Sequence, residues 1–417
     1  MHILILGKGV SGQGTKELAD FLGYSYVFAN DGDTPDLKAF VLCVTSPGFA
    51  MDSPLIRAAQ QHGIELISEM EFGFRHFPGK ILAITGTNGK TTTTELTCAL
   101  LKSLNYPAEC AGNIGLPLSS LCASVLKNEL PLETIAVLEV SSFQLEHIDK
   151  FSPHAACFIN LASDHLNRYN DSLEEYKNVK MRIFNGVANN RSFYGKSLNI
   201  NNINSSISIV DDRIYYKNIL LAEYAECNLK GKHNLENIEC ALNLVSTVLQ
   251  EEEITSGDLI TALKNFKAGH HRIEQFEFTF CGRKLTGVDD SKATNPHSVA
   301  AACRTFEPPR RQLRIILGGL DKDMDFTEIL PCVPYFAKCY LIGEAENKLF
   351  NILSQHVECE KFGKNFALCC RTMKQEASDG DILILSPACA SMDMFKNYAE
   401  RGDIFKKYLQ LDSSELQ

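Results

Sequence analysis

A glycine-flanked turn followed by a lysine and four threonines is the part of the sequence best suited to chemistry. Residues 81–104 read ILAITGTNGKTTTTELTCALLKSL: an apolar strand, a turn with Gly86 and Gly89, and an amphipathic helix that begins near Lys90. Backbone N–H groups at such a helix N-terminus bind anions, the lysine adds positive charge for the β- and γ-phosphates, and the hydroxyl of Thr91 can reach Mg²⁺. The sequence therefore predicts a nucleoside triphosphate site.

Further polar groups follow where apolar segments end. Glu139 lies in the strand pattern TIAVLEVSS, Asp164 and His165 follow the strand pattern HAACFIN, and Lys180 lies on the helix pattern EEYKNVKMRIF. An acid at the carboxyl end of a parallel strand, beside a phosphate loop, needs a metal or a basic partner, because a lone buried carboxylate is too costly. Glu139 is thus a Mg²⁺ ligand or half of a structural ion pair, and Lys180 by itself reads as a solvated helix cation.

The N-terminus carries a second glycine motif. A short apolar strand, HILIL, leads into Gly7, Gly9 and Gly12 in the spacing G-x-G-x-x-G, and a helix pattern follows. This geometry binds diphosphates, so the interpretations are a nucleotide sugar, a dinucleotide or a plain packing turn. The α/β pattern ends near residue 76, which is short for the two mononucleotide halves of a dinucleotide domain.

Polar residues also follow the strands of the last third of the chain. Asp289, Asp290 and Lys292 lie on the turn after KLTGV, and further polar turns follow the strand patterns RIILGG, CYLIG and DILILSP. Because ligands of open α/β sheets bind at the carboxyl ends of the strands, we expect these turns to converge on one ligand.

The elements that position these groups are alternating strands and helices, which predict an α/β protein of three domains. The expected domains are a Rossmann-like domain at residues 1–77, a central P-loop ATPase-like domain at 78–269 and a C-terminal Rossmann-like domain at 270–417. The Phe-Pro-Gly turn at 77–79 marks the first boundary. Residues 190–225, with their alternating pattern and NN and DD turns, predict a small antiparallel sheet.

Composition narrows the class of protein further. The net charge is −10, so the chain lacks the excess of positive charge that is typical of nucleic-acid-binding proteins. The 15 scattered cysteines, without a C-x-x-C pair, favour small buried residues in a reducing compartment over a disulfide framework or zinc site. No apolar run approaches the length of a membrane span, so we expect a soluble, cytoplasmic protein, and a monomer.

Taken together, these motifs resemble those of the Mur ligase family, which joins an amino acid to a carboxylate. The resemblance covers nearly the whole chain and is densest at TGTNGKTTT, SDHLNRY, KGKHNLEN, DDSKATN and LSPACAS. Family members that add D-glutamate have a DSKATN segment, whereas the DNPR motif of those that add diaminopimelate is not found here. The resemblance implies ATP, Mg²⁺, UDP-N-acetylmuramoyl-L-alanine and D-glutamate as ligands, and an acyl phosphate intermediate.

It also implies roles for individual residues. Catalytic roles fall on Lys90, His165, Lys180 and Arg272, the last as a clamp on the phosphates. The implied metal ligands are Thr91, Glu139, His165 and Lys180. In the family, the lysine at the position of Lys180 is carbamylated. ATP contacts are Gly86, Thr87, Asn88, Gly89, Lys90, Thr91, Thr92, Asn237 at the adenine edge, Arg272, Asp290 and Lys292. Contacts to the UDP substrate or to D-glutamate are Val10, Ser11, Ser46, Pro47, Gly48, Asn113, Ser141, Thr294, Lys322, Ser386 and Phe395.

Three other functions remain open at this point. The first is a related ligase, such as a folylpolyglutamate synthetase or another Mur enzyme, against which the first domain and the DSKATN segment argue. The second is an NAD(P)-dependent oxidoreductase built on Gly7, Gly9 and Gly12, which leaves the phosphate loop unexplained. The third is a non-catalytic ATP-binding switch that moves its domains without ligating anything.

Overall fold

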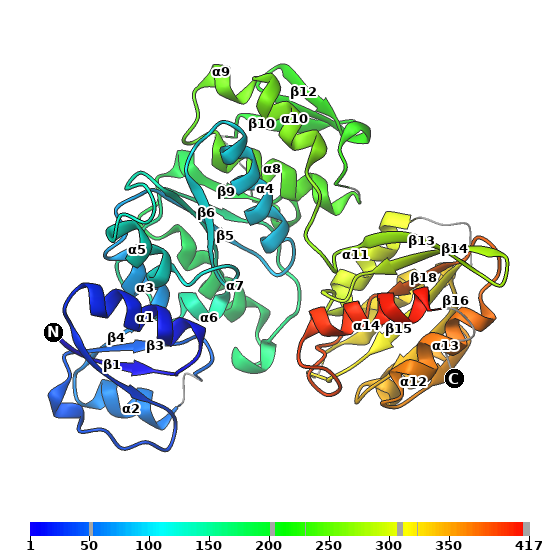
Figure 1. The fold of residues 1–417 in the computed structure, drawn as a ribbon, viewed down its shortest axis with the longest axis horizontal. Helices are drawn as coiled ribbons and strands as arrows, with labels where there is room; N and C mark the ends of the chain where they lie inside the picture. Colours follow the sequence, from blue (N-terminus) through cyan, green and yellow to red (C-terminus); the bar gives the residue numbers. More distant parts are fainter. Residues whose placement is uncertain (50–52, 201–204, 230, 307–311, 323, 412–417) are drawn as a thin grey trace. The chain divides into compact units, whose positions relative to one another are not determined.

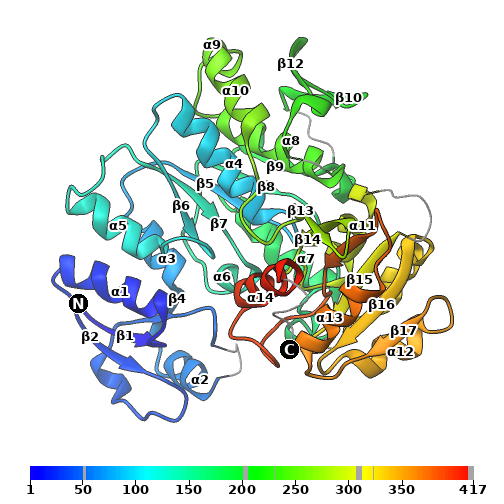
Figure 2. The ribbon, with the colours of Figure 1, turned by 45° about the vertical axis from the view of Figure 1, so that its right-hand side comes forward.

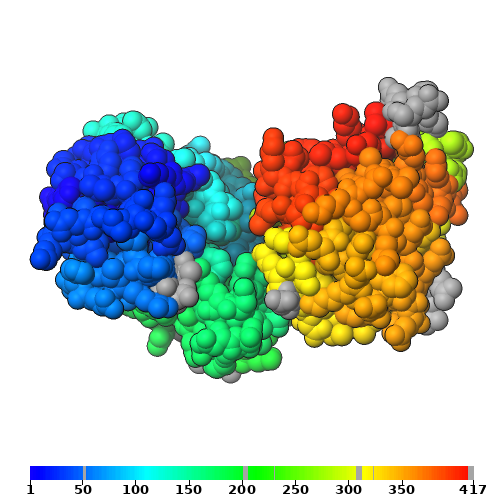
Figure 3. Space-filling model, turned by 90° about the horizontal axis from the view of Figure 1, so that it is seen from below, coloured from blue at the N-terminus to red at the C-terminus, as the bar shows by residue number. Residues whose placement is uncertain are grey.

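The computed structural model describes residues 1–49, 53–200, 205–229, 231–306, 312–322 and 324–411. Figures 1 and 2 show the ribbon in two views, and Figure 3 shows the space-filling surface in the same colours. The chain divides into two compact units: residues 1–161, 172–229 and 234–267 form the first, and residues 162–171, 230–233 and 268–417 form the second. The predicted α/β class with parallel sheets is confirmed. Within the described residues, no helix is long and apolar enough to cross a membrane.

The first unit begins with a four-stranded parallel sheet in the order β2-β1-β3-β4. Its strands are β1 (His2–Leu6), β2 (Ser25–Ala29), β3 (Leu42–Thr45) and β4 (Glu65–Ser68), and its helices are α1 (Val10–Phe21), α2 (Pro54–Gln61) and α3 (Glu69–Phe74). Side chains alternate between the two faces of a strand. Ile3 and Ile5 therefore pack in the core shared with α1, while Leu4 and Leu6 pack in the core shared with α2.

The second sheet of this unit has five parallel strands in the order β6-β7-β5-β8-β9. The strands are β5 (Ile81–Thr85), β6 (Ala108–Gly112), β7 (Ile135–Glu139), β8 (Ala155–Phe158) and β9 (Ser192–Tyr194), and the helices include α4 (Lys90–Ser103), α5 (Leu118–Leu126), α6 (Ser142–Leu145) and α7 (Leu173–Met181). The chain crosses from one side of β5 to the other between β7 and β8, so β5 lies at the switch point where such sheets bind ligands.

The two sheets of the first unit are joined through helices. α1 and α3 pack against α5, and a shared apolar core contains Phe72, Cys122 and Ala123. The carboxylate of Glu69 on α3 accepts a hydrogen bond from the backbone N–H of Ser119, at 2.7 Å, and so caps the start of α5. The first glycine-rich turn is therefore fixed to the domain that carries the phosphate loop.

The expected antiparallel sheet is present but shorter than expected. β10 (Ile207–Val210), β11 (Arg213–Tyr216) and β12 (Ile219–Glu223) form it, whereas residues 192–194 instead add strand β9 to the parallel sheet beside β8. Three helices follow, namely α8 (His233–Val245), α9 (Glu251–Ile254) and α10 (Gly257–Asn265). Lys230, in the motif KGKHNLEN, lies outside the described residues.

The second unit has a six-stranded sheet in the order β13-β14-β18-β15-β16-β17. Its strands are β13 (Glu274–Phe280), β14 (Arg283–Asp289), β15 (Leu313–Gly318), β16 (Phe336–Ile342), β17 (Cys359–Lys361) and β18 (Ile382–Leu385). β13 pairs antiparallel with β14. This edge strand, with the pattern EQFEFTF, follows closely after Arg272 and was not predicted from the sequence.

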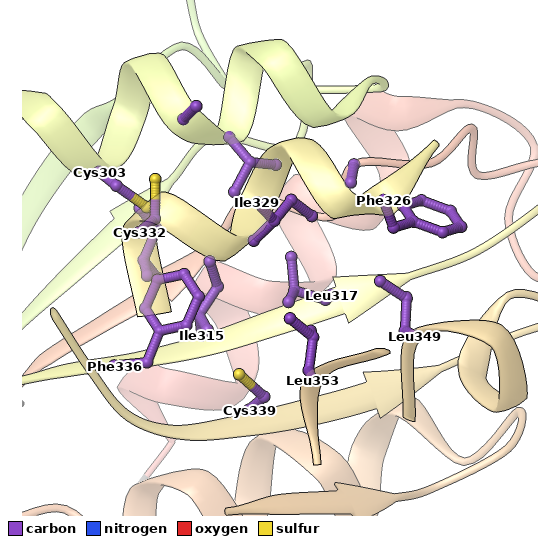
Figure 4. Close-up of a cluster of buried hydrophobic side chains, with 14 of the residues drawn as sticks. Cys303, Ile315, Leu317, Phe326, Ile329, Cys332, Phe336, Cys339, Leu349 and Leu353 are labelled. Carbon is purple, nitrogen blue, oxygen red and sulfur yellow. The ribbon is translucent and has the colours of Figure 1, made fainter. Parts of the chain in front are cut away.

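Helices cover both faces of this sheet. They are α11 (Pro296–Phe306), α12 (Glu346–Leu353), α13 (Phe366–Glu376) and α14 (Tyr398–Gln410), together with a 3₁₀ segment, η7 (Phe326–Tyr335). On one face, Ile315, Leu317 and Cys339 of the sheet pack against side chains of α11, η7 and α12 (Figure 4). Apolar side chains thus bury both faces of this sheet.

Candidate active site

The phosphate loop, defined here as residues 86–89, connects β5 to α4. Gly89 is the N-cap of α4 at φ 80°, a left-handed conformation that favours glycine, and a Cβ at this position would collide with the side chain of Asn237. The loop is anchored after β8, because the backbone N–H groups of Thr87 and Asn88 each donate to Asn160 at 2.9 Å. The loop backbone is thus fixed by contacts with two other segments.

Lys90 folds back over this loop. Its Nζ donates to the carbonyl oxygens of Gly86, at 2.9 Å, and Thr87, at 2.7 Å. The ammonium group therefore lies at the loop, where an anion bound by the N–H groups of α4 would meet it. Thr92, also predicted to contact ATP, is buried in the first turn of α4.

Glu139 ends β7, next to β5 in the sheet, and is 2% exposed. Its two carboxylate oxygens accept from the hydroxyl of Thr91, at 2.6 Å, and from the amide of Asn113, at 2.7 Å. Within the part of the chain that the structure describes, Glu139 forms no ion pair, so the alternative interpretation of a structural ion pair is not supported. A carboxylate and a threonine hydroxyl beside a phosphate loop are oxygen ligands of the kind that Mg²⁺ prefers, so the residues fit this ion.

Lys180 is not the solvated cation that its helix pattern suggested. It is 1% exposed on α7, and its Nζ donates to the carbonyl oxygen of Gly86 at 2.9 Å and lies 3.5 Å from the hydroxyl of Thr85. The ring of Tyr176 lies 4.6 Å from the same nitrogen. Lys90 and Lys180 therefore meet at one carbonyl oxygen of the phosphate loop. The interpretation of Lys180 as a solvated lysine was wrong, because this lysine lies on the buried face of α7 together with Tyr176.

Asn234 and Asn237 lie in the first turn of α8 and are both buried. The amide of Asn237 donates to the side-chain oxygen of Asn234 at 2.7 Å and packs against Gly89. The structure thus brings Asn237 to the phosphate loop, from a segment nearly 150 residues further along the chain. Its contact with adenine stays a prediction.

The residues predicted to bind the UDP substrate lie at two turns of the first sheet. Val10 begins α1 and is 73% exposed, and Ser11 follows it. The hydroxyl of Ser46 lies against Gly7, and Pro47 and Gly48 continue the same turn. Ser141, by contrast, caps α6, because its hydroxyl accepts from the backbone N–H of Gln144 at 3.3 Å.

His165 and Arg272 belong to the second unit, and their roles toward metal and ATP stay predictions. His165 begins a 3₁₀ turn at φ 54°, and its ring nitrogen lies 3.6 Å from the carboxylate of Asp164. Arg272 lies close enough to Asp290 to favour the charged form of that acid.

Asp290 follows β14 and is buried. Its carboxylate accepts from the hydroxyl of Ser386, at 2.7 Å, and from the backbone N–H of Ile273, at 3.3 Å. Burial raises the pKa of Asp290 to about 7, and these hydrogen bonds and Arg272 oppose the rise. The turns after β14 and β18 therefore meet, as the sequence predicted for the ends of parallel strands.

The resemblance implies that Thr294, Lys322 and Ser386 hold the carboxylates of D-glutamate, with Phe395 nearby, and these residues do not share one environment. Thr294 and Lys322 are partly exposed at their turns. The hydroxyl of Ser386 is buried and directed at Asp290, and the ring of Phe395 packs edge-on against Phe366, with 5.0 Å between ring centroids. Their assignment to the amino acid stays a prediction.

Sequence reasoning missed Tyr398 and Arg401 in the segment NYAERG. Arg401 is fully buried, and it donates to the hydroxyl of Ser291 at 2.9 Å, to the carbonyl of Ser291 at 2.8 Å and to the carbonyl of Cys389 at 3.1 Å. Burial lowers the pKa of Arg401 to about 10. The sequence signal that could have identified Arg401 is the position of an arginine on the apolar face of an amphipathic helix pattern.

Comparison with known proteins agrees with this fold and site. Residues 84–218 match the Mur ligase middle domain, and residues 271–389 match the Mur ligase glutamate ligase domain. The MurF ligase of Thermotoga maritima in complex with ADP has the same fold, with a TM-score of 0.61 and 16% identity over 99% of this chain and 94% of that one. A UDP-N-acetylmuramate-alanine ligase of the same organism gives a TM-score of 0.57 at 16% identity, covering 98% of each chain.

The chain belongs to the Mur ligase family. Relatives more than 30% identical to this chain include ligases that add D-glutamate by name. A UDP-N-acetylmuramoylalanine--D-glutamate ligase of Aquifex aeolicus is 34% identical over 99% of both chains. A ligase of the same name from Caldicellulosiruptor bescii is 36% identical over 88% of this chain and 83% of its own length.

Proposed function

We propose that this chain catalyses the ATP-dependent joining of D-glutamate to the carboxylate of UDP-N-acetylmuramoyl-L-alanine in peptidoglycan synthesis. The observation that carries this proposal is the 34% identity, along 99% of the chain, to a ligase named for that reaction. The DSKATN segment at residues 290–295 supports D-glutamate as the incoming amino acid, and the phosphate loop with Lys90 supports ATP, which is typical of the family.

Each domain of the proposed enzyme handles one substrate. Residues 1–77 bind the UDP substrate, residues 78–269 bind ATP and residues 270–417 bind D-glutamate. The close packing of α1 and α3 on α5 supports the first assignment, because it fixes the turn at Gly7 and Ser46 to the domain that holds ATP. Arg272 follows the second boundary, where it is suited to clamp the phosphates when the domains close.

The reaction requires activation of a carboxylate. The carboxylate of the UDP substrate attacks the γ-phosphorus of ATP, the bond to the β-phosphate oxygen breaks, and an acyl phosphate and ADP form. The amine of D-glutamate then attacks the acyl carbon, loses a proton and displaces inorganic phosphate. Lys90 stabilises charge on the transferred group, and the loop N–H groups hold the phosphates, so catalysis is mostly positioning and electrostatics.

Mg²⁺ at the phosphate loop would neutralise the phosphate oxygens when bound, with Thr91, Glu139 and His165 as its proposed ligands. Lys180 is proposed to lose a proton to solvent and, as a neutral amine, to attack CO₂, which forms a carbamate and releases a second proton. The amine of Lys180 is buried and shares the carbonyl oxygen of Gly86 with Lys90, which places the proposed carbamate at the phosphate loop. The carbamate would then add a negative charge beside the metal site.

We further propose that the enzyme acts as a monomer in the cytoplasm. The free state of all 15 cysteines in the structure suits a reducing compartment. The nucleotide-linked substrate named above supports the same location.

The decisive experiment offers the purified protein a panel of amino acids together with ATP, Mg²⁺ and UDP-N-acetylmuramoyl-L-alanine, and scores the product by mass spectrometry. We expect turnover with D-glutamate alone, and phosphate release that requires both substrates. Equal product with L-lysine or diaminopimelate would overturn the choice of amino acid. Phosphate release without either substrate would favour an ATP-binding switch, and tight binding of NADH would revive an oxidoreductase.

Lys90→Ala tests the phosphate loop in the same assay. We expect kcat to fall on the order of 100-fold or more, because the variant removes a preorganised positive charge from the phosphoryl group in transfer. Lys102→Ala is the matched control, since Lys102 lies on the same helix, α4, and forms an exposed ion pair with Glu109. Similar losses in both variants would contradict the role of Lys90.

A further inference from the structure

A half-buried tyrosine contacts the lysine of the DSKATN turn in the second unit. The Nζ of Lys292 lies 3.9 Å from the centre of the ring of Tyr398, more than 100 residues further along the chain. An ammonium group this close to an aromatic face is attracted by the electrons of the ring. Tyr398 is the first residue of α14, and the sequence analysis gave it no role.

Both partners of this contact are held in place. The hydroxyl of Ser291 donates to the carbonyl oxygen of Tyr398 at 2.7 Å, and the N–H of Lys292 donates to the carbonyl oxygen of His271 at 3.1 Å. Arg401, one turn along α14, donates to Ser291 as well. Hydrogen bonds therefore link the backbone at Tyr398 to the turn at residues 290–294 that carries Lys292.

We infer that Tyr398 is a positioning residue that orders the ammonium group of Lys292 before the reaction step. The inference rests on the proposed function, in which Lys292 faces ATP. A lysine side chain has four rotatable bonds, and its rotamer freedom costs free energy when it is ordered. A ring that orders the chain beforehand removes this cost from the reaction step.

Tyr398 also connects Lys292, which the proposed function assigns to ATP, with a segment that the proposed function assigns to D-glutamate. Tyr398 follows directly on the segment at residues 386–397, which carries Ser386 and Phe395. The hydroxyl of Ser386 binds Asp290 in the turn that carries Lys292. Movement of the segment at residues 386–397 would therefore move Lys292 through two contacts, one at Asp290 and one at Tyr398.

The test compares five forms of the full chain in the ligase assay: the wild type, Tyr398→Leu, Tyr398→Phe, Lys292→Met and Tyr398→Leu combined with Lys292→Met. Tyr408→Leu is the matched control, because Tyr408 is a partly buried ring on the same helix, packed in an apolar cluster. Steady-state constants are measured for ATP, D-glutamate and the UDP substrate, and unfolding is followed by circular dichroism.

We expect Tyr398→Leu to lower kcat by about fivefold to thirtyfold, the equivalent of one cation–π interaction, with KM for the UDP substrate unchanged. Tyr398→Phe keeps the ring and should restore most of the lost kcat. In the Lys292→Met background, Tyr398→Leu should cost nothing more, because the ring then has no cation to hold.

Two results would overturn the inference while leaving the proposed function intact. One is the same kcat for Tyr398→Leu and wild type. The other is the same loss with and without Lys292, or in Tyr408→Leu, which would show a general effect on the packing of α14. If the wild type itself forms no product with D-glutamate, the proposed function fails, whatever the variants do.

Discussion

One fully buried lysine in each unit illustrates how the same residue type can serve two purposes. Lys180 in the first unit is 1% exposed, and Lys374 in the second is 0% exposed. Lys374 lies on α13 and donates to three carbonyl oxygens, those of Tyr408, Leu409 and Leu411 at 3.0, 3.2 and 2.6 Å. These atoms form the C-terminal end of α14, where the helix dipole is negative and the last carbonyls lack partners.

The side chain of Lys180 instead reaches a turn, the phosphate loop. Its Nζ donates to the carbonyl of Gly86, which Lys90 also contacts, so two cations meet at one loop. Lys374 lies at a helix end, whereas Lys180 places its amine beside a predicted phosphate site. Burial alone therefore does not separate a structural from a functional lysine, and the atoms at the end of the side chain do.

The largest expected effect that tests this comparison is the loss of activity in Lys180→Met. We expect kcat to fall on the order of 1,000-fold, because the variant removes the amine proposed to carry the carbamate beside the metal site. Stability should stay close to wild type, since an apolar chain of similar size replaces a costly buried charge. Turnover and thermal unfolding measure the two effects.

Lys177→Met is its control, because Lys177 lies on the same helix and is partly exposed. Carbon-13 NMR after incubation with labelled bicarbonate should show a carbamate signal in wild type and none in Lys180→Met. The presence of that signal in the variant would assign the carbamate elsewhere.

A buried carboxyl in the first unit extends the comparison to acids. Glu69 accepts from the N–H of Ser119, and burial raises its pKa to about 7, from 4.5. The protonated form is favoured in the folded state, so its contribution to stability is present below pH 4.5 and is lost as pH rises through 7. From Glu69 we expect a fall of roughly 3 kcal/mol in the free energy of unfolding over this window, and Glu69→Gln should remove that share, whereas the share of Asp290, whose pKa is also raised to about 7, should remain.

Urea unfolding at pH 5, 6 and 7 measures this dependence. Glu17→Gln on the exposed face of α1 is the control and should leave the dependence as in wild type. An equally steep dependence in Glu69→Gln would mean that another group controls stability in this range.

The smallest effect is expected for Lys374→Met. The variant leaves the carbonyls at the end of α14 without their charged donor, so we expect a loss of about 2 kcal/mol in the free energy of unfolding. Turnover below the unfolding temperature should not change, because α13, which carries Lys374, holds none of the residues predicted to contact a ligand. Lys407→Met, an exposed lysine on α14, is the control, and a large loss of kcat in Lys374→Met would remove the distinction between the two buried lysines.

Much of the first unit could be predicted because its key site is contiguous. The strand, turn and helix around Gly86, Gly89 and Lys90 follow one another within 24 residues, so local pattern was sufficient. Several strands of both units were recognisable as short apolar runs, whereas β6, β9, β13 and β17 were not predicted. β9 and β13 were missed because a three-residue edge strand and an alternating edge strand depend on a partner for their identity.

The second unit resisted prediction because its polar residues are organised by distant segments. Arg401 reaches back to Ser291, Tyr398 to Lys292 and Ser386 to Asp290, each across about 100 residues. The sequence by itself determined the α/β class, the phosphate loop and the acid at the end of β7, since strand and helix periods and glycine turns act over short range. Only the tertiary structure decided that Lys180 is buried at that loop and that Tyr398 lies against Lys292. The periodicity of a helix or strand tells on which face a side chain lies, but it does not tell which distant residue packs against that face.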